Sequence, residues 1–352
     1  MKKYIWLYNE GSHFHAGTKA IKDCNRILLQ AGWEPFETNF TGKWLRDIGI
    51  TLVALWRLRS VPRDSVFFVQ FPCAKLGHVI TLMLCWRFKT IVLVHDINSL
   101  RGVGIAGLSA AFWQIRSASV VIVHTPAMSA WLKPRLKKPA IIELQIFDYM
   151  HKEDRTAVAR GAGDPRAIVF AGNLSRGKAG FLYQPLPEGR NIHLYGGNVD
   201  RDHLPACYTY QGVFAADEPR FHHHAFMGLV WDGTSVETCD GIPGYYQRFN
   251  APHKTSLYLS ADLPVFIWAE AAMAPFVRDN QCGVPVANLH EMMKIVERLD
   301  EEEYARLKAG AARVGARLRA GFYTLSAVER ALDIIADWAD RPVQVGVRGK
   351  QA

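Results

Sequence analysis

The sequence predicts an α/β protein with two domains, each built on a parallel sheet that is flanked by helices. Strand-like apolar runs alternate with amphipathic helical stretches in both halves of the chain, a rhythm typical of this class. The chain has 352 residues, which is long for one ordinary domain and enough for two buried cores. A polar stretch at 151–166 separates the halves and is a natural linker.

The first half contains four predicted strands with a helical stretch after each of the first three. The helical stretch at 19–32 carries Ile21, Cys24, Ile27 and Leu28 at spacings of three and four residues, so we expect these side chains to form one buried face. The strands are predicted at 3–9, 65–71, 89–97 and 119–125, and the other helices at 75–86 and 104–118.

The second half has the same rhythm, with apolar runs at 167–175, 191–197 and 226–233 and helices at 289–299 and 301–340. The boundaries follow from the linker and from the length of the last helical segment, which has room to pack back across the first domain. We therefore predict a first domain at 1–155, a second domain at 156–320, and a C-terminal helix at 321–352 that packs on the first domain.

Composition limits the class of protein and its compartment. The six cysteines are scattered without a C-x-x-C pair, so we expect reduced thiols, no structural zinc site and a cytoplasmic location without a secretory signal. The apolar stretch at 76–86 is shorter than the roughly 20 residues that cross a bilayer, and we expect a buried helix there. A net charge of +9 indicates an anionic partner, either nucleic acid, an anionic membrane surface or a phosphate-bearing substrate.

Ligands of parallel sheets bind beyond the carboxyl ends of the strands, so the loops there are the candidate sites. The first such loop leads into a helix with Gly17 and Thr18 near its start, where free amides could receive an anion. An ordinary strand-to-helix turn is the alternative. The loop lacks a G-x-G-x-x-G fingerprint, which argues against nicotinamide binding.

The second loop places His95 and Asp96 at the end of an apolar strand, where ionisable groups are costly unless they have partners or a task. Asp96 suits the role of a general base that takes a proton from an attacking hydroxyl. A helix N-cap formed by Asp96 or Asn98 is the alternative.

The third loop, at 171–178, joins Arg176 and Lys178 with glycines and could hold a diphosphate through charged hydrogen bonds. Exposed basic residues are common in such turns, and this is the alternative interpretation. Asn173 and Ser175 of the same loop are included as candidate binding residues.

The fourth segment, 231–264, ends in a helix that begins near Pro252. Lys254 in the first turn adds a positive charge at the end of the helix dipole that favours an anion, and the first amides are free to donate. This arrangement can stabilise a departing nucleotide diphosphate without a metal ion. The candidate binding residues are Asn250, Pro252, His253, Lys254, Thr255, Ser256 and Leu257, with Trp231, Asp232 and Glu237 earlier in the same segment.

Other conspicuous residues receive structural interpretations. The run His222 to His224 is a poor metal site because adjacent residues point in different directions. We expect Trp56 and Met273 in the core. The basic stretch 306–330 is interpreted as a solvated helix face, with contact to a membrane surface as the second option.

The chain resembles the bacterial β-1,6-galactofuranosyltransferases that build O-antigen and, more distantly, the streptococcal adhesin glucosyltransferases. The resemblance covers nearly the whole chain and is carried by HDI with LRG (95–102), IFDY (146–149), AGNLSR (171–176), GLVWDG (228–233), SVETC (235–239), FNAPHKTSLYLS (249–260) and LPVFIW (263–268).

The resemblance implies a GT-B fold, two Rossmann-like lobes with the donor in the cleft, and no metal requirement or cofactor. The first domain would then take the acceptor and the second the nucleotide sugar. Uridine-diphosphate contacts would fall on Thr18, Arg176 and 252–257, with Lys254 central. The implied partners are UDP-galactofuranose and a lipid-linked or oligosaccharide acceptor of lipopolysaccharide, with homo-oligomers and peripheral contact with the inner membrane.

The mechanism that follows is an inverting transfer. Asp96, with His95 as its helper, takes the proton of an acceptor hydroxyl that attacks the anomeric carbon from the face opposite the diphosphate. Arg176 and Lys254 stabilise the charge on the leaving uridine diphosphate.

Three other functions compete with this one. A UDP-glucose or other pyranose donor would use the same fold. A nucleic-acid-binding protein would explain the charge, although the basic residues are dispersed and the aromatic residues fall mainly in apolar strands. An NAD-dependent epimerase lacks its glycine fingerprint and a Tyr-x-x-x-Lys pair.

Overall fold

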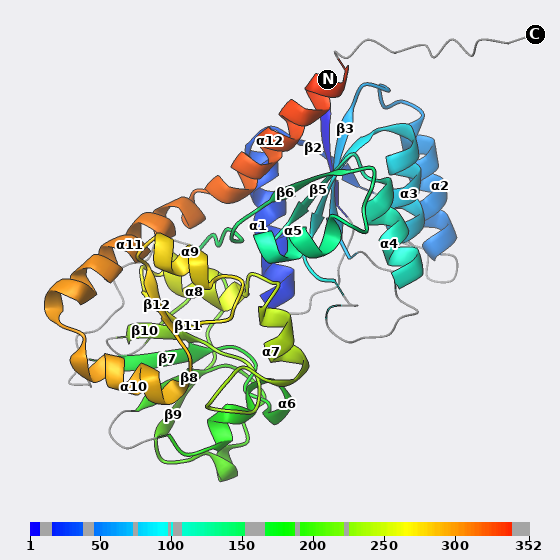
Figure 1. The fold of residues 1–352 in the computed structure, drawn as a ribbon. Coiled ribbons are helices and arrows are strands. Elements are labelled where there is room, and N and C mark those ends of the chain that lie inside the picture. Colours follow the sequence, from blue (N-terminus) through cyan, green and yellow to red (C-terminus); the bar gives the residue numbers. More distant parts are fainter. Residues whose placement is uncertain are drawn as a thin grey trace, which may run out of the picture.

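The computed structural model describes residues 1–7, 16–37, 46–72, 77–97, 100, 108–151, 166–186, 191–221 and 225–339. Two six-stranded sheets form the centres of two lobes, and the strands pair in parallel within each sheet (Figure 1). The predicted α/β class is therefore confirmed. The predicted boundary between residues 155 and 156 lies outside the described residues, as does 340–352.

The first sheet has the strand order β2-β1-β3-β4-β5-β6. Its central strands are buried along nearly their whole length and are mainly apolar, as expected for a parallel sheet with helices on both faces. The strands are β1 (Lys3–Leu7), β2 (Glu34–Glu37), β3 (Val66–Phe71), β4 (Lys89–Val94), β5 (Val120–Val123) and β6 (Ala140–Glu143). The helices are α1 (Ala16–Gln30), α2 (Arg46–Leu58), α3 (Gly77–Arg87), α4 (Leu108–Ser117) and α5 (Pro126–Leu132).

The helices of the first lobe divide between the two faces of its sheet. Phe67 of β3 belongs to one buried cluster with Leu58 of α2 and Leu84 of α3, whereas its neighbour Phe68 belongs to another with Cys24 of α1. Successive side chains of a strand point to opposite faces, so α2 and α3 lie on one face and α1 on the other. Right-handed crossovers between parallel strands require this division.

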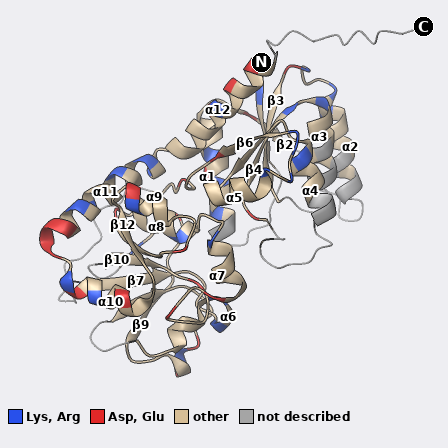
Figure 2. Ribbon diagram, in the orientation of Figure 1, with Lys and Arg blue, Asp and Glu red and all other residues tan. Residues whose placement is uncertain are grey.

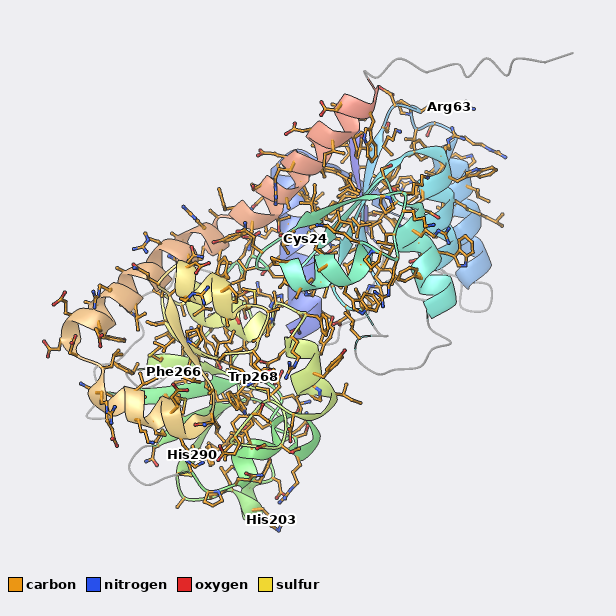
Figure 3. The ribbon with its side chains drawn as sticks, in the orientation of Figure 1. Cys24, Arg63, His203, Phe266, Trp268 and His290 are labelled. Atoms are coloured by element: carbon orange, nitrogen blue, oxygen red, sulfur yellow. The ribbon has the colours of Figure 1, made fainter. Side chains whose placement is uncertain are left out.

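The second sheet has the order β12-β11-β10-β7-β8-β9 and contains several large buried side chains, among them Phe266 and Trp268 (Figure 3). The strands are β7 (Ala167–Ala171), β8 (Ile192–Tyr195), β9 (Tyr208–Gly212), β10 (Ala225–Val230), β11 (Val265–Trp268) and β12 (Gly283–Val286). The helices are α6 (Arg176–Ala179), α7 (Gly241–Gln247), α8 (His253–Ser260), α9 (Ala274–Asp279) and α10 (Leu289–Arg298), with 3-10 turns at Gly180–Tyr183 and Arg201–His203.

Two C-terminal helices, α11 (Glu301–Arg319) and α12 (Phe322–Ala339), run from the second lobe back to the first (Figure 1). Asp300 caps α11, whose acidic first turn complements the helix dipole (Figure 2). α12 packs against α1 and β6. The predicted helical segment 301–340 is thus divided, because Gly321 has a φ of 73° that only glycine adopts readily.

Asp148 fixes the start of α12. Its carboxylate accepts hydrogen bonds from the backbone amides of Tyr323 (3.2 Å) and Thr324 (2.6 Å). The carboxylate is buried, and burial raises its pKa to about 7. The residues after β6 therefore tie the start of the C-terminal helix to the boundary between the lobes.

Two tryptophans that were predicted to be buried are exposed on the first lobe. Trp56 of α2 is 70% exposed, and Trp86, the penultimate residue of α3, is 93% exposed. Met273 is buried, as predicted. Within the described ranges, no helix combines the length and the apolar character needed to span a membrane.

Candidate active site

The candidate site lies where the carboxyl ends of the two sheets meet. In the second lobe, Ala171 ends β7 and is followed by Gly172, while β10 ends at Val230 and leads into Trp231 and Asp232. In the first lobe, β4 leads into His95 and Asp96. The predicted loops are therefore at the expected edges of the sheets.

Lys254 of α8 and Lys178 of α6 share one buried carboxylate, that of Asp232. The Nζ atom of Lys254 lies 2.6 Å from Oδ1 and 3.1 Å from the carbonyl oxygen of Trp231. The Nζ atom of Lys178 lies 2.8 Å from Oδ2. Lys254 also lies over the ring of Phe170, 4.3 Å from its centroid. Two positive charges against one negative charge leave this group, the lysine cluster, with a net charge of +1.

Burial and the neighbouring charges shift the pKa values of Asp232 and Lys254. Burial alone would raise the pKa of Asp232, but the charges of Lys254 and Lys178 outweigh burial and hold that pKa below its usual value. Burial lowers the pKa of Lys254, and the carboxylate of Asp232 opposes this shift. An additional anion beside the lysines would further oppose this lowering of the pKa of Lys254.

Two glycines bring the backbone close to Lys254. Gly172 has a φ of 150°, and a Cβ atom there would lie 2.9 Å from Cε of Lys254. Gly196 has a φ of 145°, and a Cβ atom there would lie 1.8 Å from the carbonyl oxygen of Gly172. Side chains at either position would displace the lysine or separate the ends of β7 and β8.

The start of α8 has no side-chain cap. Pro252 is the N-cap residue and its side chain cannot supply a capping oxygen. The amide of Thr255 donates to the carbonyl oxygen of Pro252 at 2.9 Å, so the candidate amide donors at the start of the helix are those of His253 and Lys254. Several buried polar atoms nearby make no hydrogen bond, namely Oδ1 of Asn250, both ring nitrogens of His253 and Oγ1 of Thr255. Unsatisfied buried groups of this kind are costly, which is typical of a site that awaits a polar ligand.

Other residues of the same turn have structural tasks. Ser256 Oγ donates to the carbonyl oxygen of Phe147, 2.7 Å away in the first lobe's final segment. Leu257 is buried in the core. These two side chains position α8 within the fold.

His95 is held as a neutral imidazole. Gln70 donates from Nε2 to Asn25 and presents Oε1 to Nε2 of His95 at 2.7 Å, so this nitrogen of His95 carries the proton. The ring stacks on Phe147 with centroids 5.1 Å apart. Burial, with His124 and His253 nearby, lowers the pKa of His95 to about 3.

Asp96 makes a direct contact with the second lobe. The hydroxyl of Tyr246 on α7 donates to Oδ1 of Asp96 at 3.1 Å and accepts from the amide of Ile97 at 3.3 Å. The carboxylate is partly exposed. Asp96 is therefore oriented by Tyr246 at the edge where the lobes meet.

The segment between α7 and α8 is bonded to the carboxyl ends of the first sheet. Thr125 Oγ1 donates to the carbonyl oxygen of Phe249 at 2.6 Å. His124 accepts from the amide of Ala251 at 3.2 Å and donates from Nε2 to the carbonyl oxygen of Val94 at 2.8 Å. These bonds place α8 close to the strand end that carries Asp96.

Arg176 lies away from the lysine cluster. Its guanidinium bonds to Asp200 at 2.9 Å and stacks on Tyr183. Asp200 also bonds to His203, which lies at the far end of the second lobe (Figure 3). The basic residue of this loop that reaches Asp232 is Lys178.

The remaining predicted residues have separate positions. Asn173 accepts from the amide of Ser175 at 3.0 Å and shapes the loop after β7. Trp231 is fully buried, and its indole donates to the carbonyl oxygen of Ser235, so only its backbone faces the lysine cluster. Glu237 is exposed and bonds to His290 at 2.8 Å.

At the other side of the site, Gly17 and Thr18 lie in the first turn of α1. Next to them, Lys19 is buried with Asp23 of its own helix and reaches Asp217 of the second lobe at 2.9 Å. In the parts of the chain that the structure describes, no three His, Cys, Asp or Glu side chains gather as metal ligands. His222 to His224 and Asn98 lie outside the described residues.

Three residues that shape the candidate site were not given a role from the sequence. His124 follows an apolar strand just as His95 does, so the same signal could have found it. Phe147 lies between the histidines, and Tyr246 orients Asp96. Phe147 lies in the IFDY stretch that carries the resemblance, but that stretch assigned it no role, and no local pattern marks Tyr246. Both roles arise from the docking of the lobes.

Comparisons with known proteins identify the family of the chain. The N-terminal and C-terminal domain models of glucosyltransferase 3-like proteins match residues 2–146 and 168–331. β-1,6-Galactofuranosyltransferase WbbI of Escherichia coli K12 is 37% identical over 281 residues, which cover 78% of this chain and 82% of that protein.

Two solved structures share the fold at low identity. The E. coli trehalose-6-phosphate structure bound with UDP-2-fluoro glucose aligns with a TM-score of 0.60 at 9% identity, covering 94% of this chain and 99% of that chain. Anabaena HepE in complex with UDP and glucose aligns with a TM-score of 0.56 at 14% identity, covering 96% and 100%. The GT-B fold is therefore confirmed.

Proposed function

Because the chain belongs to the glucosyltransferase 3-like family of GT-B glycosyltransferases, together with WbbI, we propose that it transfers galactofuranose from UDP-galactofuranose to a sugar hydroxyl of a lipopolysaccharide O-antigen or a similar surface glycan. The observation that carries the proposal is the lysine cluster beside the uncapped start of α8, across the lobe boundary from Asp96.

The lysine cluster suits a diphosphate. Lys254 and Lys178 share one carboxylate and leave a net positive charge, and the first amides of α8 add donors at the positive end of its dipole. The close approach of the Gly172 backbone to the side chain of Lys254 fixes the position of this lysine at the end of β7. We propose that these groups hold the diphosphate of the donor and need no metal ion for charge neutralisation.

Asp96 is proposed as the base. The acceptor oxygen forms a bond to the anomeric carbon as the bond between that carbon and the β-phosphate oxygen breaks. The acceptor proton moves to the carboxylate of Asp96, and uridine diphosphate leaves with the electron pair. Attack from the face opposite the diphosphate inverts the anomeric centre. His95, neutral and fixed by Gln70, would position the acceptor and take no positive charge.

The donor sugar is the finer part of the proposal. Its support is the similarity to WbbI over most of both chains. The alternative donor is UDP-glucose, which a glucosyltransferase 3-like protein would use. The unsatisfied polar atoms of Asn250, His253 and Thr255 are buried beside the start of α8 and do not distinguish the two donors.

The proposal includes the cellular setting. We propose that the enzyme acts in the cytoplasm at the inner face of the membrane, where a lipid-linked acceptor is accessible, and that it forms homo-oligomers. Nucleic acid is not a proposed partner.

The test is a donor panel with the purified chain. UDP-galactofuranose and UDP-glucose are each supplied with a galactose- or glucose-terminated acceptor, and release of UDP is measured with and without EDTA. We expect turnover with UDP-galactofuranose that EDTA leaves unchanged, and an inverted anomeric configuration by NMR. Faster turnover with UDP-glucose would assign the pyranose donor, and loss of activity in EDTA would refute metal independence.

A further inference from the structure

The first lobe exposes large apolar side chains on three of its helices. Trp86 at the end of α3 is 93% exposed, Trp56 of α2 is 70% exposed and Trp113 of α4 is 57% exposed. Leu52 and Leu55 of α2 are also exposed. Single exposed apolar residues are common, but a group of this size on one face of a lobe marks an interaction surface.

These side chains project from the same side of the lobe. Within α2, Leu52, Leu55 and Trp56 recur at spacings of three and four residues and form a stripe turned outward, while Ala54 and Leu58 face the core. The inward residues of α3 and α4 join the same buried cluster as those of α2. The three helices therefore cover one face of the first sheet, away from α12 (Figure 1).

The positive charge of the protein is concentrated in the same part of the chain. Residues 46–139 contain 13 Lys and Arg and 3 Asp and Glu, a formal charge of +10 against +9 for all 352 residues. The remainder of the chain is thus close to neutral. Arg59 and Arg63 follow α2 and are exposed, Arg63 at the outer edge of the lobe (Figure 3). Arg116 lies 5.4 Å from the ring of Trp113.

We propose that the outer face of α2, α3 and α4 docks on an anionic membrane surface. Tryptophan prefers the boundary between headgroups and acyl chains, where its ring is buried and its N–H remains solvated. Leucines of the outward stripe would insert beside it, and arginines around the face would bind lipid phosphates. The basic stretch 306–330 is a different part of the surface, and exposed tryptophans are what distinguish the face of α2, α3 and α4 from it.

A lipid surface fits this face better than the two other partners that aromatic and basic residues suggest. Single-stranded nucleic acid stacks on aromatic rings but gains nothing from the aliphatic stripe of Leu52 and Leu55. A second copy of the chain would carry the same excess of positive charge, and two such faces would repel each other. An anionic leaflet complements both the apolar and the charged components.

The experiment is sedimentation of the full chain with vesicles of phosphatidylcholine alone and of phosphatidylcholine mixed with phosphatidylglycerol. We expect binding to the mixed vesicles that salt weakens. Replacement of Trp56, Trp86 and Trp113 together by serine should lower the partition coefficient about tenfold or more, and so should Arg59→Gln with Arg63→Gln. The matched controls, Val213→Ser and the pair Lys294→Gln with Arg298→Gln, are exposed in the second lobe and should bind as the unchanged protein does.

The outcome does not depend on the transfer reaction, because the readout is binding to lipid. Affinity for UDP should stay within about twofold in every variant, which also shows that each remains folded. Equal binding of the tryptophan variant and the unchanged protein would overturn the proposal. So would dissociation of an oligomer by the same substitutions in light scattering, or tryptophan-dependent binding of single-stranded RNA without binding to vesicles.

Discussion

Replacement of Lys254 by alanine should lower kcat by about a hundredfold or more. The ammonium group lies 2.6 Å from Asp232 and is largely buried, so its charge acts on a bound anion with little screening by water. One such donor aimed at a leaving group contributes roughly 3 kcal/mol to the transition state, which corresponds to about a hundredfold in rate.

The fold should tolerate this change. Asp232 keeps Lys178 at 2.8 Å, so its carboxylate is not left unpaired, and the cost to stability should stay below the roughly 3–5 kcal/mol of an orphaned buried charge. Urea unfolding measures this cost separately from activity.

A second variant distinguishes charge from packing. Lys254→Met keeps an apolar chain over Phe170 and removes the ammonium group. The assay is UDP release at saturating donor, with Lys294→Ala of the exposed face of α10 as the control. We expect alanine and methionine to lose activity alike and the control to lose none. Recovery of near-normal kcat in the methionine variant would refute the electrostatic role.

Three further predictions address the first lobe and its boundary. Asp96→Asn should lower kcat by about a hundredfold or more and leave the Kd for UDP within about twofold by calorimetry; an unchanged kcat would exclude Asp96 as the base. Burial raises the pKa of Asp148 to about 7, so the folded chain keeps a proton that the unfolded chain releases near pH 4. The free energy of unfolding, relative to Asp148→Asn, should therefore fall by up to about 4 kcal/mol as the pH rises from about 4 to 7, and a rise over that range would contradict the assignment. Burial lowers the pKa of His253 to about 3, so its stabilising contribution exists above pH 6.5 and is lost as the pH falls. His253→Phe should retain about 2 kcal/mol more of its pH 7 stability at pH 5 than the unchanged protein does in urea unfolding, and equal losses would show that His253 does not carry this dependence.

Much of the fold could be predicted because the alternation of strands and helices is a local property of the sequence. The apolar runs of β3, β4 and β5 are buried on both faces, and such runs are easy to recognise as strands in the sequence. The break at Gly321 was not predicted, since glycines also occur inside α11 at Gly310 and Gly315, where close packing against the backbone of the second lobe requires them.

The apolar face of α2 shows what a pattern cannot decide. The helix has one apolar stripe toward the core and another toward solvent, and periodicity alone does not tell which is covered. The expectation that Trp56 is buried followed from residue type and was wrong for this reason.

The sequence predicted the loops of the candidate site one by one, and the structure shows which of their residues contact one another. His95, Asp96 and Lys254 were each singled out from their positions at strand or helix ends. The sequence could not tell that Lys178 and not Arg176 reaches Asp232, because that choice depends on the turn of α6 and on the ion pair of Arg176 with Asp200. The role of Tyr246 could not be predicted for a similar reason, since its hydroxyl contacts Asp96 only when the lobes dock.

A crystal structure of the chain with uridine diphosphate tests the central claim most directly. We predict diphosphate oxygens about 3 Å from Nζ of Lys254 or Lys178 and from the first amides of α8, with the uridine held by the second lobe. Uridine diphosphate bound at another place, with Asp232 still joined to both lysines and the start of α8 empty, would contradict the account.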